Sequence, residues 1–223
     1  MRVVIYGASG MIGQGVLLEC LDDPEIEQVL VIGRSPVGQT HAKLTERLLA
    51  DMYDQSAIAE DLRGLDACYF CLGVSAAGMS EADYARLTFD LTLYSAKLLL
   101  EKSPQICFCY VSGAGTDSSE KGRAMWARVK GKTENALLGL GFQKAYMFRP
   151  GLIQPRRGIK SKTPAYRAFY AVAWPLLPIF GALAPKQFTT TERIGRAMIQ
   201  VARRGYEKKL LDPVDINALA AAR

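Results

Sequence analysis

Residues 2–15 of this 223-residue chain read Arg2-Val-Val-Ile-Tyr-Gly7-Ala-Ser-Gly10-Met-Ile-Gly13-Gln-Gly15. The first five are mostly β-branched and apolar, which predicts a strand buried on both faces. Three glycines follow at three-residue spacing, and Val16–Leu21 continues as a helix. Residues without a Cβ atom allow so tight a strand-to-helix turn and let the backbone approach a ligand. The new helix N-terminus offers free N–H groups and a dipole, which suit a pyrophosphate.

Glycines can also serve only to pack a helix onto a strand. The strand before the glycines and the helix after them are the context that favours dinucleotide binding instead. The order of elements further along the chain supports this interpretation.

Apolar segments that predict strands alternate with segments that predict helices. We expect further strands over 27–33, 44–50, 65–73, 105–111 and 144–148, and helices over 54–62, 81–101 and 122–138. This alternation predicts an α/β fold with a doubly wound parallel sheet and right-handed crossovers. Ligands in such sheets bind at the carboxyl ends of the strands, where Gly7, Arg34, Asp51, Ser112 and Arg149 fall.

The composition is that of one globular domain, residues 1–223, with a formal net charge of +6 and a pI near 9.1. Such a charge favours an anionic ligand or surface without choosing among nucleotide, nucleic acid and lipid headgroup. No nucleic-acid-binding motif is present, so nucleic acid is not an expected partner. The apolar run at the start is too short for a signal peptide, and we expect a cytoplasmic location.

Five cysteines raise the question of a metal or redox site. Cys68 and Cys71 form a CxxC pattern, but positions three apart on a strand point to opposite faces. Cys107 and Cys109 share a face, yet His41 is the only histidine available to complete a metal site. We therefore expect reduced, buried thiols and no metal.

The second expected strand ends in Gly33-Arg34-Ser35. In a dinucleotide fold, an acidic residue here hydrogen-bonds the adenosine ribose, whereas a basic residue accommodates a 2′-phosphate. This chain has an arginine and no carboxylate, which favours NADP (NADPH) over NAD. The alternative is that Arg34 is a solvated loop residue.

The chain resembles the short-chain dehydrogenase/reductase superfamily, most closely its atypical members: the NAD(P)H-binding, epimerase-like, Tat-interacting-protein-like branch. The matching pieces run in family order from Met1 to Gly151. They are Gly7-Ala-Ser-Gly-Met-Ile-Gly13, Gly33-Arg34, Asp51, Cys71-Leu-Gly73, Val111-Ser112, Val129-Lys130-Gly131 with Glu134, and Phe148-Arg-Pro-Gly151.

The resemblance implies a Rossmann-like doubly wound parallel sheet, with a dinucleotide-binding core over 1–151 and a small, mostly helical C-terminal substrate region over 152–223. It also implies an oxidoreductase acting on a small carbonyl or alcohol. The implied cofactor contacts are Gly7, Ser9, Gly10, Met11, Ile12, Gly13, Arg34, Ser35, Asp51, Met52, Cys71, Leu72, Gly73, Lys130, Arg149, Pro150 and Gly151.

Catalysis in the family uses a tyrosine and a lysine in the pattern YxxxK, together with a serine from the preceding strand. A spacing of four places both side chains on one helical face, and the ammonium lowers the pKa of the phenol. Ser112 and Lys130 match as catalytic residues, but the tyrosine position holds Trp126. An indole N–H donates a hydrogen bond and cannot exchange a proton near neutral pH.

Three explanations of Trp126 remain open. Tyr84, Tyr94 or Tyr110 has taken the acid/base role; or the reaction needs no protein acid; or the chain binds NADP without turnover, as a regulatory or scaffold protein. An epimerase or isomerase using transient hydride transfer needs the same missing group. Trp126 can also be a simple packing aromatic.

From Leu152 the strand–helix alternation stops, so we expect the substrate side there. A basic run, Arg156–Lys162, precedes an apolar run, Ala168–Ala184, that three helix breakers interrupt. A core or dimer-packing helix pair is one interpretation; contact of residues 156–184 with an anionic membrane or a lipid-like substrate is the other. We expect a capping box at Thr189 and Glu192 to begin a helix through Arg203. The assembly is expected to be a monomer or a homodimer.

Overall fold

The computed structural model describes residues 1–159 and 187–222. Its core is a seven-stranded sheet in which every neighbouring pair of strands is parallel, in the order β3-β2-β1-β4-β5-β6-β9. The strands are β1 (Arg2–Tyr6), β2 (Gln28–Gly33), β3 (Leu44–Leu48), β4 (Ala67–Phe70), β5 (Cys107–Val111), β6 (Lys144–Phe148) and β9 (Leu210–Leu211). A separate two-stranded sheet pairs β7 (Leu152–Gln154) with β8 (Phe188–Thr190).

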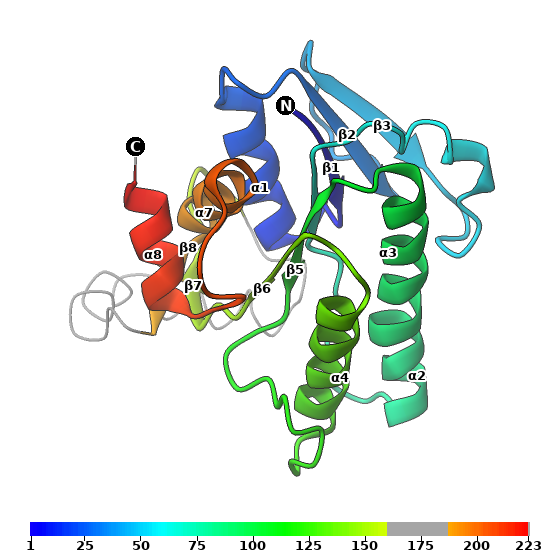
Figure 1. Cartoon of the computed structure of the whole chain (residues 1–223), viewed down its shortest axis with the longest axis vertical. Coiled ribbons are helices and arrows are strands. Elements are labelled where there is room, and N and C mark those ends of the chain that lie inside the picture. The colour runs from blue at the N-terminus through cyan, green and yellow to red at the C-terminus, as the bar shows by residue number, and fades with distance from the viewer. Residues whose placement is uncertain (160–186, 223) are drawn as a thin grey trace.

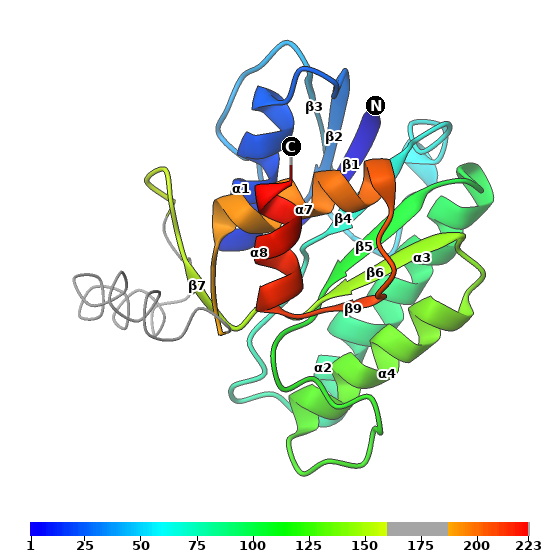
Figure 2. The same ribbon diagram turned by 60° about the vertical axis from the view of Figure 1, so that its left-hand side comes forward.

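Helices cover both faces of the large sheet (Figures 1 and 2). They are α1 (Met11–Asp22), α2 (Glu81–Ala85), α3 (Leu91–Lys102), α4 (Met125–Gly139), α7 (Thr191–Arg204) and α8 (Pro213–Ala221). Helices α1 and α7 pack on one face, with α8 beside α7, and α3 and α4 pack on the other. A π-helical turn, η2 (Arg86–Asp90), joins α2 to α3 into one continuous helical segment. The predicted doubly wound α/β fold is confirmed.

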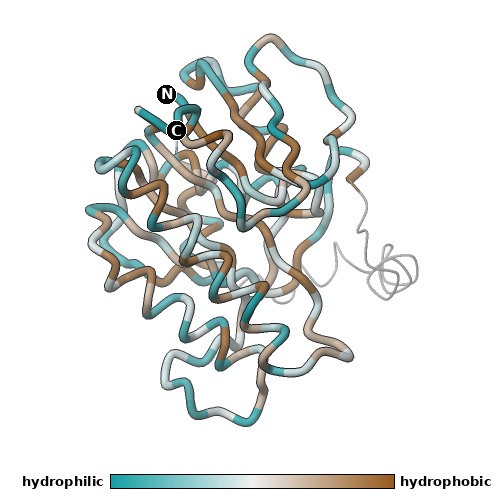
Figure 3. The backbone as a smooth tube through the Cα atoms, turned by 90° about the vertical axis from the view of Figure 1, so that its right-hand side faces the viewer, coloured by the Kyte–Doolittle hydropathy of each residue, from teal (hydrophilic) through white to brown (hydrophobic). Residues whose placement is uncertain are grey.

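The strands are buried because their side chains enter a separate hydrophobic core on each face. Val3, Ile5 and Tyr69 enter the core under α1 and α7, whereas Val4 and Phe70 enter the core under α3 and α4. Figure 3 shows the resulting runs of hydrophobic residues along the strands. β3 differs, since its residues are only partly buried at the edge of the sheet.

The strand order reverses at β1, which lies between β2 and β4. The chain leaves β1 for β2 and β3 on one side and returns to β4 on the other. Such a switch point leaves a crevice at the carboxyl ends of the strands, where ligands of doubly wound folds bind. The glycine turn follows β1 directly, so the topology places it at this crevice.

Helices α1 and α7 approach closely because glycines lie where they meet. A Cβ atom on Gly15 would lie 2.6 Å from the Thr191 side chain, and one on Gly195 would lie 2.8 Å from Cγ of Glu19. The Glu19 carboxylate accepts hydrogen bonds from Arg196 at 2.9 Å and from Arg157 at 3.3 Å. The contact therefore combines small residues with a partly buried ion pair.

Three predictions need correction. The predicted helix over 54–62 is only a 3-10 turn, η1 (Ser56–Ile58), because the buried Gln55 binds Tyr6, Met52 and Ser95 through its side chain. The cap of α7 is Thr190, whose hydroxyl accepts from the Arg193 amide at 3.1 Å, and not Thr189. The strand–helix alternation does not stop at Leu152, since α7 leads to β9, which extends the sheet beside β6.

Candidate functional site

The glycine turn has the geometry that the sequence predicted. Gly7 has a φ of +78°, and a Cβ atom there would lie 2.6 Å from the backbone nitrogen of Leu72. A Cβ atom on Gly13 would lie 2.2 Å from the carbonyl oxygen of Gly7. A side chain at either position would displace backbone, so glycine is required at both.

The start of α1 is open to a ligand. The amide of Gly10 donates to the Gly7 carbonyl at 3.0 Å, which closes the turn before the helix begins. Gly10 is the N-cap; it provides no side-chain hydrogen bond, and the first turn of α1 holds no acidic residue. The first amides of the helix, at Met11, Ile12 and Gly13, therefore carry the unneutralised positive end of the dipole. Ser9 lies in the same turn and is partly buried.

The segment after β4 forms the second wall. The Cys71 amide donates to the Tyr6 carbonyl at 2.9 Å, which continues the β1–β4 pairing by one residue. Leu72 lies against Gly7, and Gly73 has open space around it. The predicted residues Cys71, Leu72 and Gly73 therefore lie beside the glycine turn.

The ends of β2 and β3 supply the third group of predicted contacts. Arg34 and Ser35 are exposed, and Arg34 makes no ion pair with the part of the chain that the structure describes. Asp51 is exposed, and its carboxylate accepts from the Tyr53 amide at 2.9 Å, whereas Met52 is buried in the core under α3. The guanidinium of Arg34 is thus available to an anionic ligand.

Ser112 belongs to a buried polar cluster at the end of β5. Its hydroxyl donates to the carboxylate of Glu134 at 2.5 Å and lies 3.1 Å from the Phe148 carbonyl. The same carboxylate is fully buried; its two oxygens share the single Nε–H of Arg149, at 3.0 and 3.1 Å, and one of them also accepts from Nη2. Arg149 also donates to Ser118 at 2.5 Å.

Lys130 lies next to this cluster on α4. Its ammonium donates to the carbonyl of Ser112 at 2.7 Å and to that of Val111 at 3.3 Å. Burial lowers the pKa of Lys130 to about 8, against the opposing effect of the nearby Glu134 charge. The side chain is nonetheless partly exposed. Ser112 and Lys130 are therefore brought together, as the sequence predicted.

Trp126 lies one turn before Lys130 on α4 and is partly buried. A Cβ atom on Gly115 would lie 3.4 Å from its indole ring, so the ring packs over that loop. The proposed substitute Tyr110 is buried in β5, and burial raises its pKa well above the ordinary value of a phenol. Tyr84 is buried in α2, and the ring of Tyr94 packs on Tyr53 with 6.1 Å between centroids.

The loop after β6, Arg149–Gly151, was predicted to contact the cofactor, and its residues also make contacts that pack the protein itself. Arg149 is held by Glu134, and the Pro150 carbonyl accepts from the Ala114 amide at 2.9 Å. A Cβ atom on Gly151 would lie 2.4 Å from the Gln187 carbonyl, so the missing side chain allows the chain to pass β8. The absence of a Cβ at Gly151 thus has a reason independent of any ligand.

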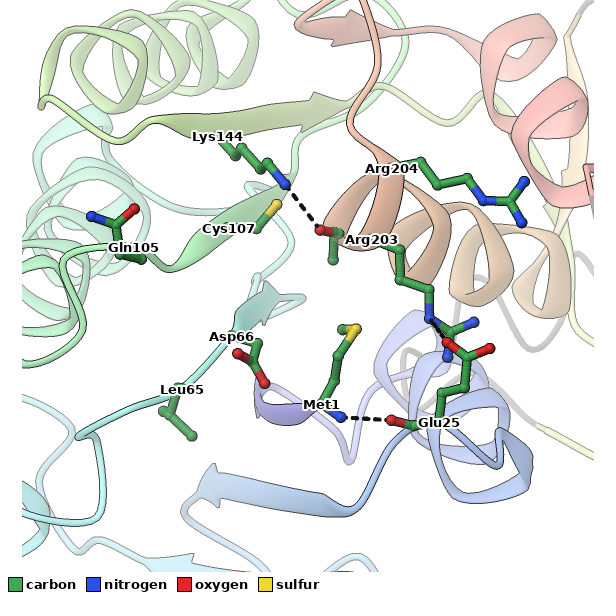
Figure 4. Close-up of a pocket in the computed structure, with 10 residues that line it drawn as sticks. Met1, Glu25, Leu65, Asp66, Gln105, Cys107, Lys144, Arg203 and Arg204 are labelled. Carbon is green, nitrogen blue, oxygen red and sulfur yellow. Dashed lines mark hydrogen bonds and ion pairs between the residues drawn. The ribbon is translucent and has the colours of Figure 1, made fainter.

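A cavity of about 510 Å³ lies at the opposite edge of the sheet (Figure 4). It is lined by the start of the strands and the end of α7, including Asp66, Lys144 and Arg203. Ligands of this fold bind at the carboxyl edge. This cavity is therefore not the site formed by the glycine turn.

The cysteines are arranged as predicted. Cys68 enters the core under α3 and α4, Cys71 packs against the core under α1 and α7, and Cys107 and Cys109 share that second face. All five are free thiols, and burial raises the pKa of Cys71 to about 12. Within residues 1–159 and 187–222, no group of three or more His, Cys, Asp or Glu side chains could hold a metal.

Other predictions concern the C-terminal third. The apolar run 168–184 and the last three residues of the basic run, 160–162, lie outside the described residues, so both interpretations stay predictions. In the described part of the chain, no helix has the length and apolarity needed to cross a membrane. Arg157 binds Glu19 and Asp22.

Sequence reasoning missed the structural importance of Glu134. It was one of several matching residues, with no contact assigned to it. Its contacts reach Ser112, 22 residues earlier, and Arg149, 15 residues later, and a single sequence gives no sign of either. A carboxylate on the buried face of α4, four residues after Lys130, was the available signal, because buried carboxylates are normally paired.

No protein-family model matches the chain. Among curated proteins, Fmp52 of Emericella nidulans is 26% identical over 205 residues, covering 89% of this chain and 85% of that protein. HTATIP2 of Rattus norvegicus is 27% identical over 154 residues, covering 68% of this chain and 62% of that protein.

Solved structures show the same fold. A short chain dehydrogenase family protein from Francisella tularensis superposes with a TM-score of 0.63 at 16% identity, covering 92% of this chain and 91% of that one. MoeE5 in complex with UDP-glucose and NAD superposes with a TM-score of 0.67 at 13% identity, covering 99% and 81%.

The comparisons contradict one expectation. The Fmp52 relatives from several fungi are named as mitochondrial proteins. The expected cytoplasmic location is therefore wrong. Its only basis was the absence of a signal peptide, which does not discriminate between the cytoplasm and other compartments reached without one.

Proposed function

The chain matches the atypical short-chain dehydrogenase/reductase superfamily in sequence and in fold, and from this premise we propose that it is an NADP-dependent oxidoreductase acting on a small carbonyl or alcohol. The observation that carries the proposal is the glycine turn at the switch point of the sheet. Gly7 and Gly13 leave a cradle that a Cβ atom would fill, in front of a helix N-terminus without an acidic residue. Such a cradle suits the diphosphate of a dinucleotide.

The neighbouring residues fit the remaining parts of the cofactor. Arg34 is exposed and has no ion pair within residues 1–159 and 187–222, so its guanidinium suits a 2′-phosphate, because guanidinium groups bind phosphate through two parallel hydrogen bonds. The backbone of Cys71 and Leu72 lies directly beside the turn, and Asp51 follows β3 at the carboxyl edge of the same sheet. A bound nicotinamide would supply the hydride, and Lys130, whose ammonium donates to the carbonyls of Val111 and Ser112 at the end of β5, would be the residue available to contact it. NADP is favoured over NAD because no carboxylate follows β2.

Arg34→Ala tests the choice of cofactor. We expect the dissociation constant of NADPH to rise about 30-fold and that of NADH to change by less than about threefold, since only NADPH carries the 2′-phosphate. Calorimetric titration of the full chain measures both. Arg63→Ala, at an exposed arginine paired with Glu60, is the matched control. Equal losses for the two cofactors would remove the argument for NADP.

A second candidate function follows from Trp126. Since the indole cannot exchange a proton and packs over Gly115, the chain could be an NADP-binding regulatory protein without turnover. Two panels, aldehydes and ketones with NADPH and nucleotide-sugar alcohols with NADP+, followed by NADPH absorbance, separate the two. Binding without a change in NADPH absorbance across both panels favours the regulatory protein, whereas NADPH consumed with any carbonyl or formed with any alcohol favours the enzyme.

The remaining partner predictions are untested. A small-molecule substrate follows from the proposed reaction, and nucleic acid is not proposed as a partner. A monomer or homodimer, and contact of residues 156–184 with a membrane or lipid-like substrate, stay predictions.

A further inference from the structure

Trp126 occupies the position of the tyrosine that would act as acid/base at the carboxyl edge of β5, so another side chain must transfer the proton. The replacement must titrate near neutral pH, reach the crevice and have no other fixed partner that holds its proton. Among the described residues, four kinds of group are candidates: the indole of Trp126, the tyrosine phenols, the carboxylate of Glu134 and the ammonium of Lys130.

The tyrosines fail on accessibility or on position. Tyr110 is buried within β5 and its pKa is raised, so its phenol keeps its proton at neutral pH. Tyr84 is a buried residue of α2. Tyr94 is 37% exposed, but its ring contacts Tyr53 in a tilted arrangement, and Tyr53 follows β3, which lies on the other side of β1 from β5.

The carboxylate of Glu134 and the hydroxyl of Ser112 fail because each is already engaged in hydrogen bonds within the protein. Glu134 is fully buried, and its carboxylate accepts hydrogen bonds from Nε and Nη2 of Arg149, so its oxygens already have partners. The Ser112 hydroxyl has two acceptors within the protein, Glu134 and the Phe148 carbonyl. Its proton is therefore directed inward, and it is better suited to holding the end of β5 in place.

Lys130 meets all three conditions. The residue is partly exposed, and within the described residues its ammonium donates to two backbone carbonyls, which take no proton, and lies 5.9 Å from the centroid of the Tyr110 ring. Two of the three ammonium hydrogens are used by those carbonyls, and one remains for a ligand. Burial brings its pKa to about 8, so both protonation states are populated near neutral pH.

We infer that Lys130 Nζ is the catalytic residue that transfers the proton to or from the substrate oxygen, in place of the tyrosine that Trp126 replaces. In carbonyl reduction, an N–H bond of the ammonium breaks, an O–H bond forms on the substrate oxygen, and the resulting amine regains a proton from water. Oxidation of the alcohol runs the same transfer backwards. The inference rests on the proposed function, which supplies the hydride from NADPH.

Lys130→Arg separates proton transfer from charge. Arginine keeps the positive charge and the donors for the two carbonyls, but it stays protonated at every accessible pH. We expect kcat for carbonyl reduction to fall at least about 100-fold, while the dissociation constant of NADPH changes less than about fivefold. Lys132→Arg, on the exposed face of the same helix, is the matched control and should leave kcat unchanged. Trp126→Phe should retain turnover within about threefold, because the indole N–H transfers no proton.

Two pH measurements complete the test. The reduction rate of the wild type should fall above about pH 8, as the ammonium loses its proton. Competitive acetylation of the full chain, read by mass spectrometry at Lys130, should show a midpoint near the same pH without any substrate. A midpoint near that of an ordinary lysine, or full turnover by Lys130→Arg, would overturn the inference and leave the proposed function standing. Failure of NADPH to bind in calorimetry would instead overturn the proposed function.

Discussion

Two buried glutamates, Glu19 and Glu134, each pair with arginine, but the two ion pairs lie in different regions and differ in their exposure to solvent. Glu19 is 9% exposed and bridges α1 to Arg196 of α7, which is 51% exposed. Glu134 is fully buried, and its partner Arg149 is 21% exposed. The first pair joins two helices on one face of the sheet, whereas the second joins three segments at the carboxyl edge. The Glu134–Arg149 pair is less exposed to solvent and includes Ser112. Its loss should therefore lower the stability of the fold and also disturb the candidate site at the end of β5.

Glu134→Ala should give the largest effect. Removing the carboxylate leaves Arg149 without its partner and Ser112 without an acceptor, and breaking a buried pair costs about 3 kcal/mol or more. The midpoint of urea unfolding measures the loss. Glu134→Gln keeps an acceptor for Ser112 and should lose less. Equal stability of Glu134→Ala and the wild type would show that the cluster is not structural.

Gly195→Ala tests the other region through its packing. The new Cβ atom would meet Cγ of Glu19 at 2.8 Å and Cα of Val16 at 3.1 Å, so α1 and α7 must separate, at a cost of about 2 kcal/mol. Thermal unfolding measures it, with Gly139→Ala as the control, since a Cβ there has open space. We expect NADPH affinity to stay within about twofold, because the change is remote from the glycine turn.

Lys130 gives the carboxyl-edge cluster a pH dependence. Its pKa in the folded chain is about 8, below the value of about 10.4 in an unfolded chain. Between these values the unfolded state binds more protons, so the contribution of Lys130 to the unfolding free energy rises with pH. We expect a rise of about 1.5 kcal/mol, half the full value because the side chain is partly exposed.

The measurement compares the wild type with Lys130→Met from pH 7 to 10.5. The difference in their unfolding free energies should change in favour of the wild type as the pH rises, with most of the change above pH 8. A constant difference across this range would show that the lysine is not desolvated. Glu19→Gln should leave this pH dependence intact.

Glu19→Ala should give the smallest loss of stability, about 1 kcal/mol, because Arg196 and Arg157 are well exposed and regain water when the carboxylate is removed. Urea unfolding at low and high salt measures it, and high salt should reduce the difference. A loss as large as that of Glu134→Ala would mean that exposure of the arginines does not decide the cost.

The contrast between these regions also shows what a sequence can predict. Residues 2–13 predicted the strand, the turn and the helix that follows, because a buried strand, glycine spacing and a helix are all local patterns. Lys130 beside Ser112 followed from the superfamily's spacing. β9 was not foreseen, since two paired residues carry no periodicity and depend on β6 being next to them.

Contacts between residues far apart in the sequence could not be predicted, because they form only when the folded chain brings their segments together. Gln55 replaces a predicted helix with a buried network to Tyr6 and Ser95, 49 and 40 residues away. Gly15 and Gly195 have meaning only when α1 meets α7. Thr189 and Thr190 are both able to cap α7, but the Thr189 hydroxyl donates to Asn217, 28 residues away, and the Thr190 hydroxyl accepts from the Arg193 amide.

The central claim is that the amides at the start of α1 hold the diphosphate of NADPH. Hydrogen–deuterium exchange of the full chain, with and without NADPH, tests it at single peptides. We predict slower exchange across Ala8–Gln14 on adding NADPH, with no change across the amino-edge cavity residues Gln105 and Lys144. Unchanged exchange over Ala8–Gln14 at saturating NADPH would contradict the account.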